Sequence, residues 1–224
     1  MSWVEAHLSL IVILGLIVII LVLISVWRTS RKRVKRRIFR KKAKGHIYLI
    51  SDTHFDHANI IRYCKRPFPN VRIMNRVLVK NWNNTVRPGD TVYFLGDWAF
   101  GRGSRQPKYW VRKLKGHIIS IKGSHDGRGR GLRLYNRRIL DYKGHKFLLI
   151  HNPDHKDVKW HDWVIHGHKH NHSAKYPFIN GREKTINVGA ELTNYRPVSL
   201  DFILSLGIDS IRRMDTVDSK PKRK

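Results

Sequence analysis

The chain has 224 residues, enough for one domain with a substantial hydrophobic core and too few for two full-sized domains. Its formal net charge is +29, from 45 Lys and Arg against 16 Asp and Glu, so the expected partner or surface is anionic. The single cysteine, Cys64, excludes an internal disulfide bond and is typical of a protein in a reducing compartment.

The N-terminal region contains one long apolar run, at residues 8–27, which is rich in Leu, Ile and Val. At roughly 1.5 Å per residue, such a run is long enough to cross a hydrocarbon core of about 30 Å. A cleaved signal peptide is the alternative, but no Lys or Arg precedes the run and no small-residue cleavage site follows it. The run therefore predicts one transmembrane helix, preceded by a short extracytoplasmic N-terminus at residues 1–7.

A strongly basic segment follows the apolar run. Residues 28–44 contain 11 Lys and Arg and no acidic residue. Because basic residues beside a membrane helix stay cytoplasmic, we predict a single-pass membrane protein with its N-terminus outside and its catalytic domain in the cytoplasm. This juxtamembrane linker is expected to lie against anionic lipids, and a nucleic-acid-binding arm is the alternative interpretation.

From residue 45 onward, short β-type runs alternate with helical ones, which predicts a layered α/β domain at 45–210 and a basic tail at 211–224. We expect strands at 46–50, 91–95, 117–121, 136–142, 146–150, 163–165 and 185–188. We expect helices at 71–86 after an Asn70 cap, at 109–114, and at 200–206 after a Ser199 cap.

Aspartate and histidine residues follow the ends of these predicted strands. The segments are Asp52-Thr53-His54, Gly96-Asp97, Gly123-Ser124-His125-Asp126, His151 and Gly167-His168-Lys169-His170. Ligands of α/β sheets bind outside the carboxyl ends of strands, so the segments are expected to converge on one site. Alternate residues of an extended segment point the same way, so the Asp-x-His and His-x-His pairs are each expected to face one metal. Mixed carboxylate and imidazole ligands suit Mn, Fe, Zn, Co or Ni.

In this order, the five segments resemble the motifs of the calcineurin-like metallophosphoesterase superfamily: Asp-x-His, Gly-Asp, Gly-Asn-His-Asp or -Glu, a lone His, and Gly-His-x-His. The residues that flank these motifs are similar to those of the small single-domain branch of the superfamily. The resemblance covers essentially everything after residue 44. It implies a layered sandwich of mixed sheets flanked by helices, here preceded by the predicted transmembrane helix.

The resemblance also implies a role for each matching residue. The first divalent metal ion would be bound by Asp52, His54 and His170, the second by His151 and His168, and both by a bridging Asp97. His125 would act as general acid or stabilise charge beside the phosphate, and Asp126 would orient it. The implied reaction is hydrolysis of a phosphomono- or phosphodiester by a hydroxide that two metal ions activate, with manganese as the first expectation.

The sequence departs from the family pattern at Ser124, where the family has an asparagine ligand of the second metal. The serine side chain is shorter, so we expect weaker binding of the second ion rather than its loss. An inactive member of the family is the alternative.

The excess positive charge favours a polyanionic substrate, namely a nucleotide, a nucleic-acid end or an anionic lipid headgroup. The alternative function is a membrane-tethered protein that keeps the fold and binds nucleic acid or anionic lipid without turnover. Five histidines outside the motifs are expected on the surface, namely His57, His117, His145, His155 and His161. The sequence sets no oligomeric state.

Overall fold

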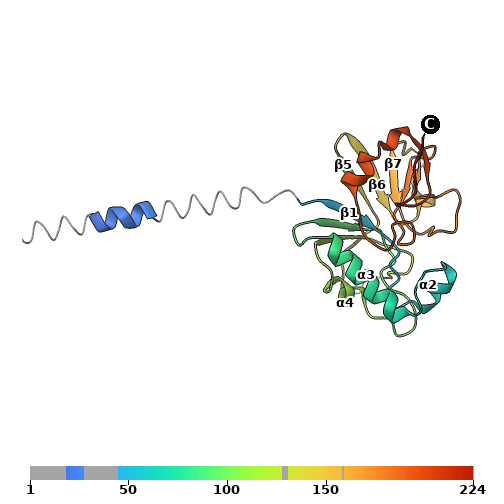
Figure 1. Ribbon diagram of the computed structural model, residues 1–224, viewed down its shortest axis with the longest axis horizontal. Helices are drawn as coiled ribbons and strands as arrows, with labels where there is room; N and C mark the ends of the chain where they lie inside the picture. Colours follow the sequence, from blue (N-terminus) through green and yellow to red (C-terminus); the bar gives the residue numbers. More distant parts are fainter. Residues whose placement is uncertain (1–18, 28–44, 128–130, 158, 224) are drawn as a thin grey trace, which may run out of the picture. The chain divides into compact units, whose positions relative to one another are not determined.

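The computed structural model describes residues 19–27, 45–127, 131–157 and 159–223 (Figure 1). Chain contacts divide the protein into two units, Met1–Lys44 and Gly45–Lys224. The second unit begins at the residue where we predict the domain to begin. The predicted N-terminus at 1–7 and the basic linker at 28–44 lie outside the described residues, as does the first part of the predicted helix at 8–27.

The described part of the apolar run is a helix at 19–27. Within the described residues, none of the helices combines the length and the apolar character that crossing a membrane requires. This finding overturns the predicted single-pass membrane localisation.

In the described part of the second unit, a mixed five-stranded sheet has the order β10-β1-β2-β3-β4. Its strands are β1 (Ile47–Ile50), β2 (Thr91–Phe94), β3 (His117–Ile121), β4 (Leu134–Tyr135) and β10 (Val198–Ser199). The first four are parallel, and β10 pairs antiparallel with β1.

A seven-stranded sheet of the described residues has the order β12-β11-β8-β9-β7-β6-β5. Its strands are β5 (Arg137–Tyr142), β6 (His145–Ile150), β7 (Trp163–His166), β8 (Ile179–Asn180), β9 (Thr185–Asn187), β11 (Ile211–Met214) and β12 (Lys222–Arg223). The predicted strands at 136–142 and 146–150 are present as β5 and β6, which pair antiparallel. The segment 211–224 differs from the tail that we predict, because β11 and β12 pair within the sheet.

The helices are α2 (Ala58–Tyr63), α3 (Val71–Thr85), α4 (Pro107–Val111) and α5 (Leu200–Ser205), with short 3-10 turns at Pro153–His155 and Ile208–Ser210. The predicted caps are present, since Asn70 accepts a hydrogen bond from the Ile73 amide and Ser199 accepts one from the Phe202 amide. Figure 1 shows α3 and α4 on one side of β1, and β5, β6 and β7 on the other.

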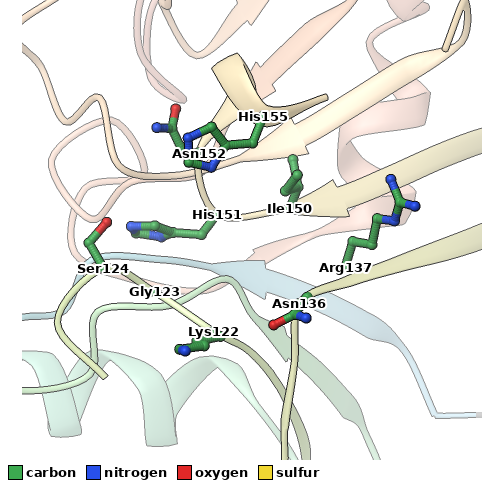
Figure 2. Close-up of a pocket in the computed structure, with 9 residues that line it drawn as sticks. All are labelled: Lys122, Gly123, Ser124, Asn136, Arg137, Ile150, His151, Asn152 and His155. Carbon is green, nitrogen blue, oxygen red and sulfur yellow. The ribbon is translucent and has the colours of Figure 1, made fainter. Parts of the chain in front are cut away.

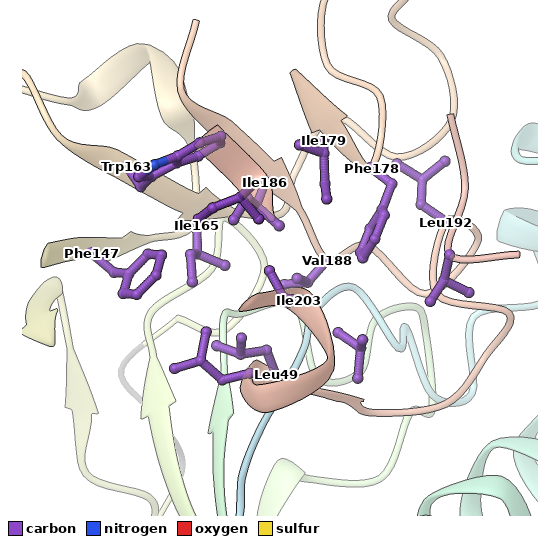
Figure 3. Close-up of a cluster of buried hydrophobic side chains, with 14 of the residues drawn as sticks. Leu49, Phe147, Trp163, Ile165, Phe178, Ile179, Ile186, Val188, Leu192 and Ile203 are labelled. Carbon is purple, nitrogen blue, oxygen red and sulfur yellow. The ribbon is translucent and has the colours of Figure 1, made fainter. Parts of the chain in front are cut away.

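Two hydrophobic cores separate these layers. Because successive strand residues point to opposite faces, Leu49 of β1 faces the seven-stranded sheet while Ile50 faces α3. Figure 3 shows the first core, in which Ile203 of α5 lies among Leu49, Phe147 and Val188. The predicted layered α/β fold, with mixed sheets flanked by helices, is confirmed, and its parallel strands are covered on both faces.

Candidate metal centre

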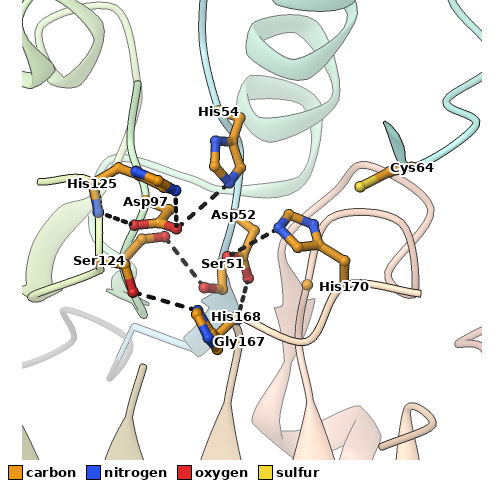
Figure 4. Close-up of polar contacts among 12 residues, drawn as sticks. Ser51, Asp52, His54, Cys64, Asp97, Ser124, His125, Gly167, His168 and His170 are labelled. Carbon is orange, nitrogen blue, oxygen red and sulfur yellow. Dashed lines mark hydrogen bonds and ion pairs between the residues drawn. The ribbon is translucent and has the colours of Figure 1, made fainter. Parts of the chain in front are cut away.

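The carboxyl ends of five strands meet at one edge of the two sheets. Asp52 follows β1, Asp97 follows β2, Ser124 and His125 follow β3, His151 follows β6, and His168 and His170 follow β7. Figure 4 shows the side chains of this set other than His151 facing one another, although they come from segments up to more than a hundred residues apart. His151 Nε2 lies 3.4 Å from Asp97 Oδ2. The structure therefore brings together all of the metal-ligating residues predicted from the sequence.

The first donor group consists of Asp52, His54 and His170, whose ligand atoms all lie within 4.8 Å of one another. Asp52 Oδ1 lies 3.9 Å from His170 Nε2. Asp52 and His54 are buried, yet Asp52 Oδ1 and His54 Nε2 have no hydrogen-bond partner among the described residues. Buried polar atoms without a partner are costly, and a cation between them would satisfy both.

The second donor group consists of Asp97, His151 and His168, again within 4.8 Å. His151 Nδ1 lies 2.7 Å from the Leu95 carbonyl oxygen, so this nitrogen carries the proton. Its other nitrogen, Nε2, lies 3.4 Å from Asp97 Oδ2 and has no hydrogen-bond partner in the described part of the chain, so it is the nitrogen available to a cation. An imidazole held in this way by a backbone carbonyl is typical of a metal ligand.

Asp97 lies between the two groups. Its Oδ2 is 3.5 Å from His54 Nε2 of the first group and 3.4 Å from His151 Nε2 of the second. The other oxygen, Oδ1, accepts a hydrogen bond of 2.8 Å from the His125 amide, which holds the carboxylate in place. One carboxylate oxygen is thus available to both groups.

The backbone at the site is strained. Asp52, His54, Asp97, His168 and His170 have left-handed φ values of 56°, 48°, 61°, 67° and 45°. Each such residue costs roughly 1–3 kcal/mol, and such strain clusters where side chains must be aimed at a ligand. The extended geometry that we predict for the Asp-x-His and His-x-His pairs is therefore wrong. The chain turns at each ligand, and this turn brings the paired side chains together.

Two glycines allow the carboxylates to lie against the backbone. A Cβ atom on Gly123 would lie 2.3 Å from Asp97 Oδ1, and one on Gly167 would lie 2.3 Å from Asp52 Oδ2. No side chain fits at either position without moving a carboxylate. Glycine is thus required at these two positions by the close approach of the carboxylates.

The family model of the calcineurin-like phosphoesterase superfamily domain matches residues 46–197. The chain belongs to this superfamily. The resemblance predicted from the five motifs is confirmed at this level, and the protein is a metal-dependent phosphoester hydrolase.

Two similar proteins have no assigned function. Protein MJ1445 of Methanocaldococcus jannaschii, which is uncharacterized, is 52% identical over 163 residues, covering 71% of this chain and 90% of its own length. The crystal structure of AQ665 from Aquifex aeolicus, a protein of unknown function, has 27% sequence identity and a TM-score of 0.56. The match covers 72% of the present chain and 99% of the AQ665 chain.

In this phosphoesterase, Asp126 has a different task from the predicted one. Its carboxylate accepts hydrogen bonds from the amides of Asp97, Trp98 and Gly123, at 3.0, 2.9 and 2.8 Å. It therefore holds the Asp97 turn against the β3 turn instead of orienting the His125 ring. His125 itself is exposed, with its Nε2 4.0 Å from Asp97 Oδ2 and its ring 4.1 Å from that of Phe100.

Three further residues support the first donor group and have no signal in the motif spacing. Glu191 Oε1 lies 3.1 Å from His170 Nδ1 and pairs with Arg66 Nη2 at 2.6 Å. Arg66 also donates to the carbonyls of Asp52 and Thr53. His57, which we expect on the surface, is buried, and its Nδ1 lies 3.3 Å from His54 Nδ1.

The histidines of the site fall into two classes, those whose pKa is lowered and those whose pKa is raised. Burial lowers the pKa of His54 and brings that of His168 to about 4. Burial also opposes the charged form of His151, but the nearby carboxylates of Asp97 and Asp52 outweigh this and raise its pKa to about 9. The pKa of His170 is raised to about 11, because Asp52, Cys64 and Glu191 together outweigh burial. Without a metal, the carboxylates thus hold two protonated imidazoles.

Metal binding should therefore release protons. A cation needs neutral His151 and His170, whose pKa values of about 9 and about 11 leave both charged at pH 7.5. Because fewer protons compete as the pH rises, the apparent affinity for Mn²⁺ should increase between pH 6.5 and 8.5, by roughly tenfold per unit for each proton released. Calorimetric titration in buffers of different ionisation enthalpy measures the proton number. Equal affinities across this range with no proton release would contradict the assignment.

Proposed function

We propose that this protein hydrolyses a phosphomono- or phosphodiester with two divalent metal ions bound side by side. The observation that supports this proposal most strongly is the position of Asp97 Oδ2, 3.5 Å from His54 Nε2 and 3.4 Å from His151 Nε2. One carboxylate oxygen between two sets of nitrogen and oxygen donors is the arrangement that a bridging ligand requires.

The residues fit such ions. Each donor group contains a buried atom that lacks a hydrogen-bond partner within the described residues, as expected where a cation completes the site. We assign Asp52, His54 and His170 to one ion, His151 and His168 to the other, and Asp97 to both. Ser124 Oγ lies 3.4 Å from His168 Nδ1, at the edge of the second group. The mixed donor set suits Mn, Fe, Zn, Co or Ni, and we propose manganese first.

When bound, two divalent ions neutralise the charge of the phosphate and lower the pKa of a water molecule. The protein contributes position and proton transfer. Asp126 fixes the Asp97 turn through three backbone amides. His125 is exposed at the mouth of the site, where it can donate a proton to a leaving oxygen or stabilise charge on the phosphate.

A direct test uses the purified protein and bis-p-nitrophenyl phosphate, with p-nitrophenyl phosphate as the monoester. We expect release of p-nitrophenolate with Mn²⁺, a background rate after EDTA, and recovery when Mn²⁺ is returned in excess. Protein that binds metal but hydrolyses neither compound with Mn, Fe, Zn, Co or Ni would contradict the proposal. That outcome would favour a phosphate-binding protein without turnover.

A further inference from the structure

Two cavities flank the exposed pair Ser124 and His125. The larger, of about 560 Å³, includes Ser124 and His151 in its lining and therefore opens onto the second donor group. The smaller, of about 420 Å³, includes His125 and Phe100. Since one member of the Ser124–His125 pair lines each cavity, a phosphate at His125 would have space for a substituent on both sides. A monoester would fill one cavity, whereas a diester would fill both.

The larger cavity is lined by groups that bind anions. Its wall contains Lys122, Arg137 and His155, together with the amide side chain of Asn136, and none of the described lining residues is acidic. Figure 2 places Ser124 and the His151 ring on one side of this cavity and Asn136 and Arg137 on the other. The basic side chains of Lys122 and Arg137 thus lie beside the metal centre and form a group separate from it.

The positive charge of this cavity is not neutralised by the protein. Lys122 and Arg137 are exposed, and in the described part of the chain neither has an ion-pair partner. By contrast, Lys143, Lys169 and Arg196 pair with aspartates elsewhere in the domain. Unpaired cations around a concave surface raise the local potential and attract an anionic group. Arginine in particular binds phosphate oxygens through two parallel hydrogen bonds.

The smaller cavity has a different character. Phe100 is 40% exposed, and its ring lies 4.1 Å from the His125 ring. A partly exposed phenyl ring beside His125 is a group against which a nucleobase can stack. Arg102 and Arg105 lie in the same wall. An aromatic side chain in one cavity and unpaired basic side chains in the other thus match a nucleobase and a phosphate of the same nucleotide chain.

We infer that the substrate is a short nucleotide chain whose scissile phosphodiester lies at His125 and whose neighbouring phosphate lies in the cavity of Lys122 and Arg137. This inference rests on the proposed function and names its substrate class. The neighbouring phosphate adds binding energy away from the reacting atoms, so it should lower KM more than it raises kcat.

The test compares thymidine dinucleotides that differ only in phosphate number: TpT, with one phosphate, and pTpT and TpTp, with two. At least one two-phosphate form should have a kcat/KM about 10-fold to 100-fold above that of TpT, the range expected for charged hydrogen bonds. Arg137→Ala and Lys122→Ala should remove this advantage, so that each variant hydrolyses pTpT, TpTp and TpT with similar kcat/KM. Arg138→Ala is the matched control, because Arg138 is the next residue of β5, stacks on Tyr135 and does not line the cavity.

Equal rates for the three dinucleotides, or an advantage that survives both substitutions, would overturn the inference. The inference would also be overturned if ATP, but neither two-phosphate dinucleotide, showed a higher kcat/KM than TpT that depends on Arg137. The cavity would then bind the second phosphate of a polyphosphate. Binding of the same compounds is measured in parallel without metal. If neither bis-p-nitrophenyl phosphate nor any dinucleotide is hydrolysed, the proposed function fails. In that case, tighter Arg137-dependent binding of pTpT or TpTp than of TpT would still support the binding of a second phosphate in the larger cavity, and equal binding would overturn it.

Discussion

Substitution Asp97→Asn should lower kcat/KM for bis-p-nitrophenyl phosphate by roughly 10³-fold, the loss expected when a central electrostatic group of a site is removed. The carboxylate oxygen that lies between His54 and His151 would become part of a neutral amide. An amide has a weaker attraction for cations, so both proposed metal sites lose affinity together. Initial rates across a Mn²⁺ titration separate the loss of binding from the loss of turnover.

Asp141→Asn provides the control for the change of charge, because Asp141 is exposed on β5 and belongs to none of the motifs. It should leave the rate within about twofold. Circular dichroism checks that both variants keep the fold. If the folded Asp97→Asn protein hydrolyses the diester at the unaltered rate, Asp97 has no part in the mechanism.

Substitution Ser124→Asn should tighten binding of the second metal ion. The Ser124 hydroxyl lies 3.4 Å from His168 Nδ1, and it is the position at which the superfamily pattern has asparagine. The amide oxygen of asparagine reaches further from the backbone than a serine hydroxyl, so it supplies a direct ligand. We expect the affinity of the second site to rise by about 10-fold to 100-fold, the usual effect of one ligand-supporting group.

The first site provides the internal control for this substitution, because Asp52, His54 and His170 are untouched and their affinity should not change. Calorimetric titration of both proteins with Mn²⁺ resolves the two steps. Two equally tight sites in the unaltered protein, or no tightening in the variant, would show that Ser124 does not limit the second site.

Much of the fold was predictable because its elements have strong local signals. The helix α3 was predicted from a capping Asn70 and from apolar residues at helical spacing, namely Val71, Met74, Leu78 and Trp82, and the structure buries the last three. The helix α2 was missed, since it has six residues and no side-chain cap. The two-residue strands β4, β8, β10 and β12 were also missed, because their pairing depends on partners distant in sequence.

The sequence predicted which residues converge, but not how they are held. Motif order and strand ends were enough to bring Asp52 and His170 together. The contact between Glu191 and Arg66 joins residues 125 positions apart, and nothing in the local pattern of either residue predicts it. The left-handed backbone at the ligands and the use of Asp126 as an amide acceptor likewise depend on tertiary contacts. The membrane prediction relied on the composition of one apolar run, and within the described residues no helix combines the length and apolar character that a membrane span requires.

The most direct test of the account is an anomalous-difference map from crystals soaked in Mn²⁺. The account predicts two peaks, one on each side of the Asp97 carboxylate, the first contacting Asp52, His54 and His170 and the second contacting His151 and His168. A single peak that does not contact Asp97, or strong peaks only at other places on the protein, would contradict it.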